Sequence, residues 1–124
     1  MLKALIVDDN DEIRDFVSLM LQDFGYATVI ASNGRLGVRA LGEVGPFDVA
    51  IVDLYMPEMD GIEFIKAVRA DPAFKKTRLL VATNASLRSH IQKALDAGAD
   101  EYLMKPFSPE MLKQKLRLLK VFPD

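Results

Sequence analysis

Three acidic side chains come directly after two short apolar runs of this sequence. Asp8 and Asp9 follow residues 5–7, Leu-Ile-Val, and Asp53 follows residues 49–52, Val-Ala-Ile-Val. Unbroken apolar runs of this kind are typical of strands that are buried on both faces of a parallel sheet. The carboxyl ends of such strands border the crevice in which open α/β sheets bind ligands. We therefore expect the three carboxylates to face a ligand at one edge of a sheet.

Three carboxylates this close together repel one another unless a cation lies among them. Mg²⁺ prefers carboxylate, carbonyl and water oxygens. Together with Lys105, which follows the last apolar run, the three acids carry a formal charge of −2 that one Mg²⁺ would neutralise. Such a site could accept a phosphoryl group, because the metal ion and the ammonium would neutralise the phosphoryl oxygens while a carboxylate attacks the phosphorus. Thr83 could donate a hydroxyl hydrogen bond to one of those oxygens.

The elements that position these side chains are five strand-like segments alternating with five helix-like ones. Strict alternation with short connections predicts an α/β fold, a (βα)5 flavodoxin-like three-layer sandwich with a five-stranded parallel sheet of order 2-1-3-4-5. In this order the first and third strands are neighbours, which brings Asp8 and Asp9 beside Asp53. The expected strands are residues 5–7, 26–31, 49–52, 79–82 and 102–104, and the expected helices are residues 11–24, 36–44, 61–70, 87–97 and 109–119.

The helices differ in how clearly their buried faces can be recognised. The first has apolar residues at helical spacing, Phe16 among them, which predicts a continuous buried stripe. The second has a weaker stripe that includes Leu36 and Val44, and Gly37 and Gly42 interrupt it. Each of these glycines would cost up to about 1 kcal/mol in a helix interior relative to Ala. The predicted N-caps are Asn10 or Asp11, Asp60 in a capping box with Glu63, Ser86 and Ser108.

The composition limits the class of protein. The 124 residues fit a single domain of common size, and with no Cys there is neither a disulfide framework nor a thiolate metal site. A cytoplasmic setting is the simplest expectation, since no segment is long enough to cross a membrane and the first apolar run is too short for a signal peptide. Sixteen basic and eighteen acidic residues give no general attraction to nucleic acid. His90, the single histidine, is expected to be solvated.

Taken in order, these motifs resemble the receiver domain of two-component response regulators, and in particular single-domain regulators of the chemotaxis type. The resemblance extends from Leu2 to Val121, essentially the whole chain. Each motif alone is weak, but their order on successive strand ends is highly specific. The residues that carry it are Asp8-Asp9, Asp53 with Met56-Pro57 and Asp60-Gly61, Thr83, and Tyr102 with Lys105-Pro106-Phe107.

The resemblance implies a role for each of these positions. Asp53 would be the phosphoacceptor, receiving its phosphoryl group from a sensor histidine kinase or a phosphotransfer protein. Lys105 would pair with that group, and its peptide bond to Pro106 is expected to be cis. Thr83 would move toward the phosphoryl oxygens and Tyr102 would turn inward behind it. The implied protein ligands of Mg²⁺ are Asp8, Asp9, Asp53 and the backbone carbonyl of Tyr55.

The same resemblance implies that the signal appears on the face made by the fourth helix, fifth strand and fifth helix, where a downstream protein partner would bind. Phosphorylation could also drive dimerisation. The protein would catalyse its own phosphorylation, and could catalyse its own dephosphorylation, without turning over an external metabolite. Because the chain ends just past the fifth helix, residues 1–124 are expected to form one receiver domain without an output domain. The sequence leaves open whether it is a stand-alone regulator or part of a longer protein.

Two positions depart from the pattern of the family. Asn84 follows Thr83 where a small residue is usual, and Tyr55 is bulky. Both are expected beside the phosphoryl pocket, and we hypothesise that they alter the lifetime of the phosphorylated state. The main alternative is a phosphorylation-independent, receiver-like protein-binding module. A nucleotide or flavin binder is disfavoured because the acid-rich turn at residues 8–11 repels phosphate, and a hydrolase is disfavoured because no further acid–base group can be recognised.

Overall fold

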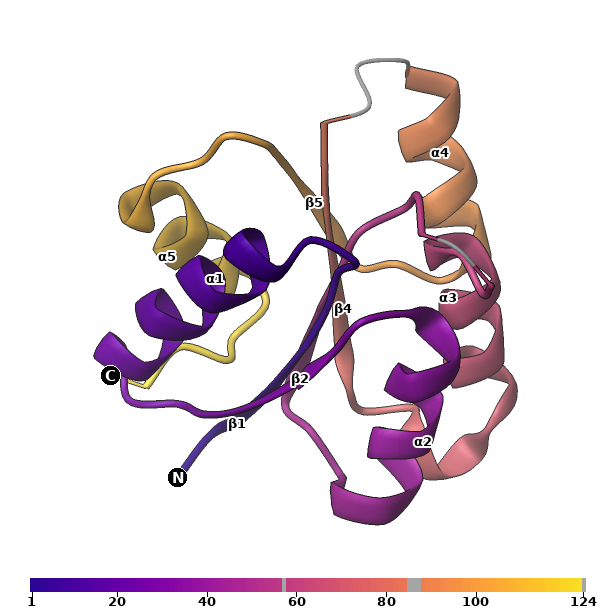
Figure 1. Cartoon of the computed structure of the whole chain (residues 1–124), viewed down its shortest axis with the longest axis horizontal. Coiled ribbons are helices and arrows are strands. Elements are labelled where there is room, and N and C mark those ends of the chain that lie inside the picture. The colour runs from indigo at the N-terminus through magenta and orange to yellow at the C-terminus, as the bar shows by residue number, and fades with distance from the viewer. Residues whose placement is uncertain (57, 85–87, 124) are drawn as a thin grey trace.

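The computed structural model describes residues 1–56, 58–84 and 88–123, and in this part of the chain five strands alternate with five α-helices (Figure 1). The strands are β1 (Lys3–Val7), β2 (Ala27–Ala31), β3 (Val49–Val52), β4 (Arg78–Thr83) and β5 (Glu101–Met104). The helices are α1 (Asp11–Asp23), α2 (Gly34–Val44), α3 (Gly61–Ala70), α4 (Arg88–Ala97) and α5 (Pro109–Leu118), with a short 3₁₀ helix, η1 (Pro72–Phe74), that the sequence pattern did not predict. Among the described residues, no helix combines the length and the apolar character that crossing a membrane requires.

The sheet confirms the predicted topology. Its strands are all parallel and have the order β2-β1-β3-β4-β5. Val7 at the end of β1 pairs with Val52 at the end of β3, and Val52 pairs with Val81 in β4. The residues that follow β1 and β3 therefore emerge at the same level of the sheet. Its carboxyl edge places Asp8 beside Asp53.

The helices cover the two faces of the sheet unequally. Figure 1 shows α1 and α5 on one face and α2, α3 and α4 on the other. The strands supply both layers of the core with alternating side chains. Leu5 and Val7 of β1 belong to the apolar cluster under α2, α3 and α4, whereas Ala4 and Ile6 belong to the cluster under α1 and α5. This alternation explains why β1 is apolar at every position.

Short polar residues begin several helices, as predicted. Asn10 accepts a hydrogen bond from the backbone N–H of Ile13 and caps α1. Asp60 and Glu63 form the expected capping box at the start of α3. Ser108 caps α5. Ser86, predicted to cap the fourth helix, lies outside the described residues.

The predicted apolar stripes of α1 and α2 were partly wrong. Phe16 is 56% exposed, and Leu36 and Val44 are also exposed. Helix α2 instead packs through Gly37, where a Cβ atom would lie 2.8 Å from Cε1 of Phe64. The small residue lets the helix approach the sheet closely, and Leu41 on the same helix is buried in the core, whereas Leu36 and Val44 lie at the margin.

Candidate functional site

The three acids predicted to meet do so at the carboxyl edge of the sheet. Asp8, Asp9 and Asp53 each place one carboxylate oxygen within 4.8 Å of the others. Two backbone hydrogen bonds position Asp8 and Asp53: the N–H of Asp8 donates to the carbonyl of Ala31 at 3.1 Å, and that of Asp53 to the carbonyl of Val7 at 2.9 Å. These two acids are thus fixed by continuations of the strand ladders. Asp8 is buried, Asp53 is partly buried and Asp9 is exposed.

Lys105 brings a cation to this cluster from the end of β5. Its Nζ lies 2.6 Å from Oδ2 of Asp8 and 3.6 Å from Oδ2 of Asp53. The backbone N–H of Lys105 donates to the carbonyl of Thr83 at 2.9 Å, which ties the lysine loop to the end of β4. The peptide bond between Lys105 and Pro106 is cis.

Burial raises the pKa of Asp53 above its ordinary value. The ammonium of Lys105 acts in the opposite direction, and the negative charge of Asp8 raises the pKa of Asp53 further. The backbone N–H groups of Leu54 and Tyr55 donate to the carboxylate and favour its charged form. Asp53 is therefore an acid whose charge is incompletely compensated, and it would gain from additional positive charge.

This set of residues fits a divalent cation of the Mg²⁺ type. The donors are hard carboxylate oxygens, and Lys105 alone does not neutralise the three acids. The protein already engages two of these donors. Oδ1 of Asp8 accepts a hydrogen bond from the backbone N–H of Asn10 at 2.9 Å while its Oδ2 faces Lys105, and the Asp53 carboxylate accepts hydrogen bonds from the backbone N–H groups of Leu54 and Tyr55. Asp9 is exposed.

The other predicted site residues differ in position and burial. Thr83 is fully buried at the end of β4. Asn84 is exposed and lines a cavity of about 300 Å³ together with Lys105 and residues of α1. Tyr55 is half exposed and borders a hollow that it shares with Asp9. Tyr102 lies farther along the sheet, partly buried on β5.

Comparison with known proteins identifies the family to which this chain belongs. The sequence pattern that defines the response regulator receiver domain matches residues 4–117. The chain belongs to this family. The receiver domain is 35% identical over 119 residues to the chemotaxis protein CheY1 of Helicobacter pylori, covering 95% of this chain and 96% of that protein. It is 37% identical over 116 residues to the chemotaxis protein CheY of Pseudomonas aeruginosa, with 93% of each chain covered.

Solved structures agree. The receiver domain superposes on the chemotaxis protein CheY4 of Vibrio cholerae with a TM-score of 0.90 and 40% identity, over 96% of this chain and 98% of that chain. A signal receiver domain of a histidine kinase from Syntrophus aciditrophicus has a TM-score of 0.87 at 28% identity. Both matches extend over 96% of this chain, and they cover 98% and 89% of the two neighbouring chains, so the likeness covers nearly the complete fold.

Two contacts of the receiver domain, one to Tyr55 and one to Asp8, were not predicted from the sequence. His90, which was expected to be solvated, is partly exposed, and its Nδ1 is hydrogen bonded to the hydroxyl of Tyr55, with the two ring centroids 5.5 Å apart. Arg14 donates from its guanidinium to the backbone carbonyl of Asp8 at 2.8 Å. The contact between Tyr55 and His90 has no signal in the sequence, because it joins residues 35 positions apart.

Proposed function

We propose that this receiver domain accepts a phosphoryl group on Asp53 in the presence of Mg²⁺. The donor would be a phosphohistidine of a sensor histidine kinase or of a phosphotransfer protein. The observation that carries the proposal is the convergence of three carboxylate oxygens within 4.8 Å beside the ammonium of Lys105. A nucleophile, a candidate cation site and a fixed positive charge together form the set that in-line phosphoryl transfer requires.

In the transfer, a carboxylate oxygen of Asp53 attacks the phosphorus and forms a new P–O bond. The P–N bond to the donor breaks, and its electron pair returns to the imidazole ring. Lys105 is placed to pair with the phosphoryl oxygens, since its Nζ already lies 3.6 Å from Asp53. Bound Mg²⁺ would neutralise the remaining negative charge on those oxygens. Its protein ligands would be Asp8, Asp9, Asp53 and the backbone carbonyl of Tyr55.

The signal would leave the site through β4 and β5. Thr83 is buried at the end of β4, where it would move to hydrogen bond a phosphoryl oxygen, and Tyr102 would follow it inward. Tyr102 is linked to α5, because Nζ of Lys115 lies 4.7 Å from its ring centroid and 3.0 Å from Glu101. Movement of the tyrosine would therefore disturb the α4-β5-α5 face. We infer that a downstream protein partner, or a second copy of the chain, reads this change.

As a receiver domain, the protein is a signalling protein. Its chemistry would be confined to its own phosphorylation and to hydrolysis of its own acyl phosphate, in which water attacks the phosphorus and releases the Asp53 carboxylate. We propose that residues 1–124 act as one regulatory domain in the cytoplasm, where phosphohistidine donors of two-component systems are found.

The proposal is tested by the intact mass of the protein after incubation with acetyl phosphate or phosphoramidate, with and without Mg²⁺. We expect a gain of one phosphoryl group that requires Mg²⁺ and is abolished in Asp53→Asn. Asp15→Asn, which removes an exposed carboxylate of α1, is the matched control and should be labelled like the wild type. Absence of labelling from either donor and from a phosphorylated histidine kinase would support the phosphorylation-independent binding module.

A further inference from the structure

A second candidate site lies at the opposite edge of the sheet, where the strands begin. A cavity of about 590 Å³ opens there between the segment before β3, the segment from η1 to the start of β4, and the end of α5. Pro46 and Phe47 line one side, Lys75 and Lys76 a second, and Lys120 a third. We call it the basic cavity. Its volume falls within the range of about 300–1,000 Å³ that is usual for small-molecule sites.

The charge of the lining is strongly one-sided, although the whole chain has a formal charge of −2. Among the described residues a single acid, Asp48, lines the cavity, and one of its carboxylate oxygens accepts a hydrogen bond from the backbone N–H of Lys3 at 2.8 Å. The cationic side chains that line it are Lys3, Lys75, Lys76, Arg78 and Lys120.

None of these five cations forms an ion pair with an acid among the described residues. Lys3 has other contacts, because its ammonium contacts the carbonyl of Val44 and lies 5.2 Å from the ring centroid of Phe47. Elsewhere in the chain several cations are paired, such as Arg69 with Asp100. The remaining four, which are exposed, are Lys75, Lys76, Arg78 and Lys120.

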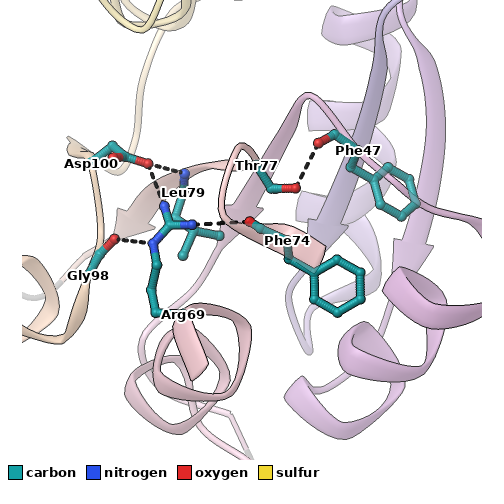
Figure 2. Close-up of polar contacts among 7 residues, drawn as sticks. All are labelled: Phe47, Arg69, Phe74, Thr77, Leu79, Gly98 and Asp100. Atoms are coloured by element: carbon teal, nitrogen blue, oxygen red, sulfur yellow. Dashed lines mark hydrogen bonds and ion pairs between the residues drawn. The ribbon is translucent and has the colours of Figure 1, made fainter. Parts of the chain in front are cut away.

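The walls of the basic cavity are joined by hydrogen bonds. The hydroxyl of Thr77, a buried residue, donates to the carbonyl of Phe47 at 2.8 Å, and Figure 2 shows this bond linking the segment before β3 to the segment before β4. The N–H of Arg78 donates to the carbonyl of Asp48 at 3.0 Å. On the far side of the same segment, Arg69 donates to the carbonyl of Phe74 at 3.4 Å (Figure 2). The cavity is therefore preformed.

The backbone of Lys120 has a conformation that is unusual for a lysine. Its φ is 61°, in the left-handed region that favours glycine, at the end of α5. The N–H of Lys120 donates to the carbonyl of Arg117 and that of Val121 to the carbonyl of Leu116, which closes the helix as a glycine would. A lysine occupies this position in spite of its conformational cost, and its side chain lines the basic cavity.

We propose that the basic cavity binds a small molecule that carries two or more adjacent phosphate groups. Several cations around a cavity of this size match a ligand of high negative charge density. The apolar part of the lining, which includes Pro46, Pro72 and Leu119, offers contact to an organic portion such as a nucleoside. This inference is independent of phosphorylation at Asp53, which lies at the other edge of the sheet.

The test is calorimetric titration with pyrophosphate and, separately, with ATP, in buffer freed of divalent cations so that the acidic site repels phosphate. We expect saturable binding that is weakened about tenfold or more in the double variant Lys75→Glu/Lys76→Glu. Lys66→Glu, which reverses an exposed lysine of α3 outside the cavity, is the control and should change the affinity less than about twofold. Asp53→Asn should bind like the wild type.

The variant Ala73→Trp fills the cavity without changing its charge. It therefore tests whether binding depends on the space in the cavity as well as on its cations. It should weaken binding of ATP while the thermal unfolding midpoint stays near that of the wild type. Tighter binding of ATP than of pyrophosphate would identify a nucleotide, and equal binding would identify the phosphates alone as the ligand; either result supports the proposal. The proposal is overturned if neither ligand binds, if Lys66→Glu weakens binding as much as the double variant, or if a hexaglutamate peptide binds more tightly than both.

Discussion

The ammonium of Lys105 lies closer to the buried carboxylate of Asp8, at 2.6 Å, than to that of Asp53, at 3.6 Å. The compensating charge therefore lies closest to the more buried of the two acids. Asp53, the proposed nucleophile, keeps a raised pKa and an incompletely balanced charge. The site favours the arrival of positive charge, whether from a metal ion or from the lysine moving toward a phosphoryl group.

Lys105 has two proposed roles: it supplies a fixed counter-charge to the acids, and it pairs with the phosphoryl oxygens. Replacing Lys105 should separate these two roles. In Lys105→Ala the acids lose their fixed cation, so we expect Mg²⁺ to bind about tenfold more tightly by calorimetry. Phosphoryl acceptance from acetyl phosphate should nevertheless fall, because no ammonium then pairs with the phosphoryl oxygens. Lys66→Ala, an exposed position on α3, should change neither quantity. Unchanged Mg²⁺ affinity in Lys105→Ala would refute the electrostatic coupling.

The raised pKa of Asp53 predicts a pH-dependent cost to stability. The folded chain binds this proton more tightly than the unfolded chain, so the contribution of Asp53 to the free energy of unfolding falls as the pH rises above the ordinary value of 3.8 and through the raised pKa. Without Mg²⁺, Asp53→Asn should raise the free energy of unfolding at neutral pH by about 1 kcal/mol. The gain should shrink as the pH is lowered toward 4.

Urea unfolding followed by circular dichroism at neutral and at acidic pH measures this difference. Asp15→Asn should show no comparable gain, because that carboxylate is exposed. A gain for Asp53→Asn that is the same at both pH values would show that burial of the charge is not its cause.

Two glycines of α2 predict opposite effects of the same substitution. At Gly37 a Cβ atom would lie 2.8 Å from Cε1 of Phe64 and 3.0 Å from Cγ2 of Val7, so Gly37→Ala should lower the free energy of unfolding by about 1–3 kcal/mol. At Gly42 no heavy atom of the described residues outside the backbone of its own helix would lie within 4 Å of an added Cβ atom. Gly42→Ala should therefore raise the free energy of unfolding by about 0.5–1 kcal/mol through helix propensity. Denaturant unfolding of both variants checks the pair. Stabilisation by both would mean that α2 does not pack through Gly37.

Tyr55 and Asn84 are predicted to set the lifetime of the phosphorylated state. Tyr55 borders a hollow that it shares with Asp9, and its hydroxyl is hydrogen bonded to His90. From this position we expect its ring to hinder an attacking water molecule. We expect Tyr55→Ala to speed hydrolysis of the acyl phosphate severalfold, His90→Phe to have a smaller effect in the same direction, and Asn84→Ala to change the rate as well. Loss of the phosphorylated mass with time measures each rate. If all three variants hydrolyse the acyl phosphate at the wild-type rate, Tyr55 and Asn84 do not set the lifetime of the phosphorylated state.

Much of the fold and site could be predicted because it depends on local patterns. The apolar runs before Asp8 and Asp53 identify buried parallel strands, and the topology of such sheets then brings their ends together. The packing of α2 could not be predicted, because the approach at Gly37 depends on Phe64 of another helix. The bond between Tyr55 and His90 was missed for the same reason. Contacts between elements distant in sequence leave no periodicity to detect.

The central claim, that Asp53 is the phosphoacceptor, is tested most directly by borohydride reduction of the phosphorylated protein followed by peptide mass spectrometry. Borohydride reduces an aspartyl phosphate to homoserine and so marks the residue that carried the phosphoryl group. We predict homoserine at position 53, dependent on Mg²⁺ during phosphorylation. Homoserine at Asp8, Asp9 or Asp60 instead, or a phosphoryl group retained on His90, would contradict the account.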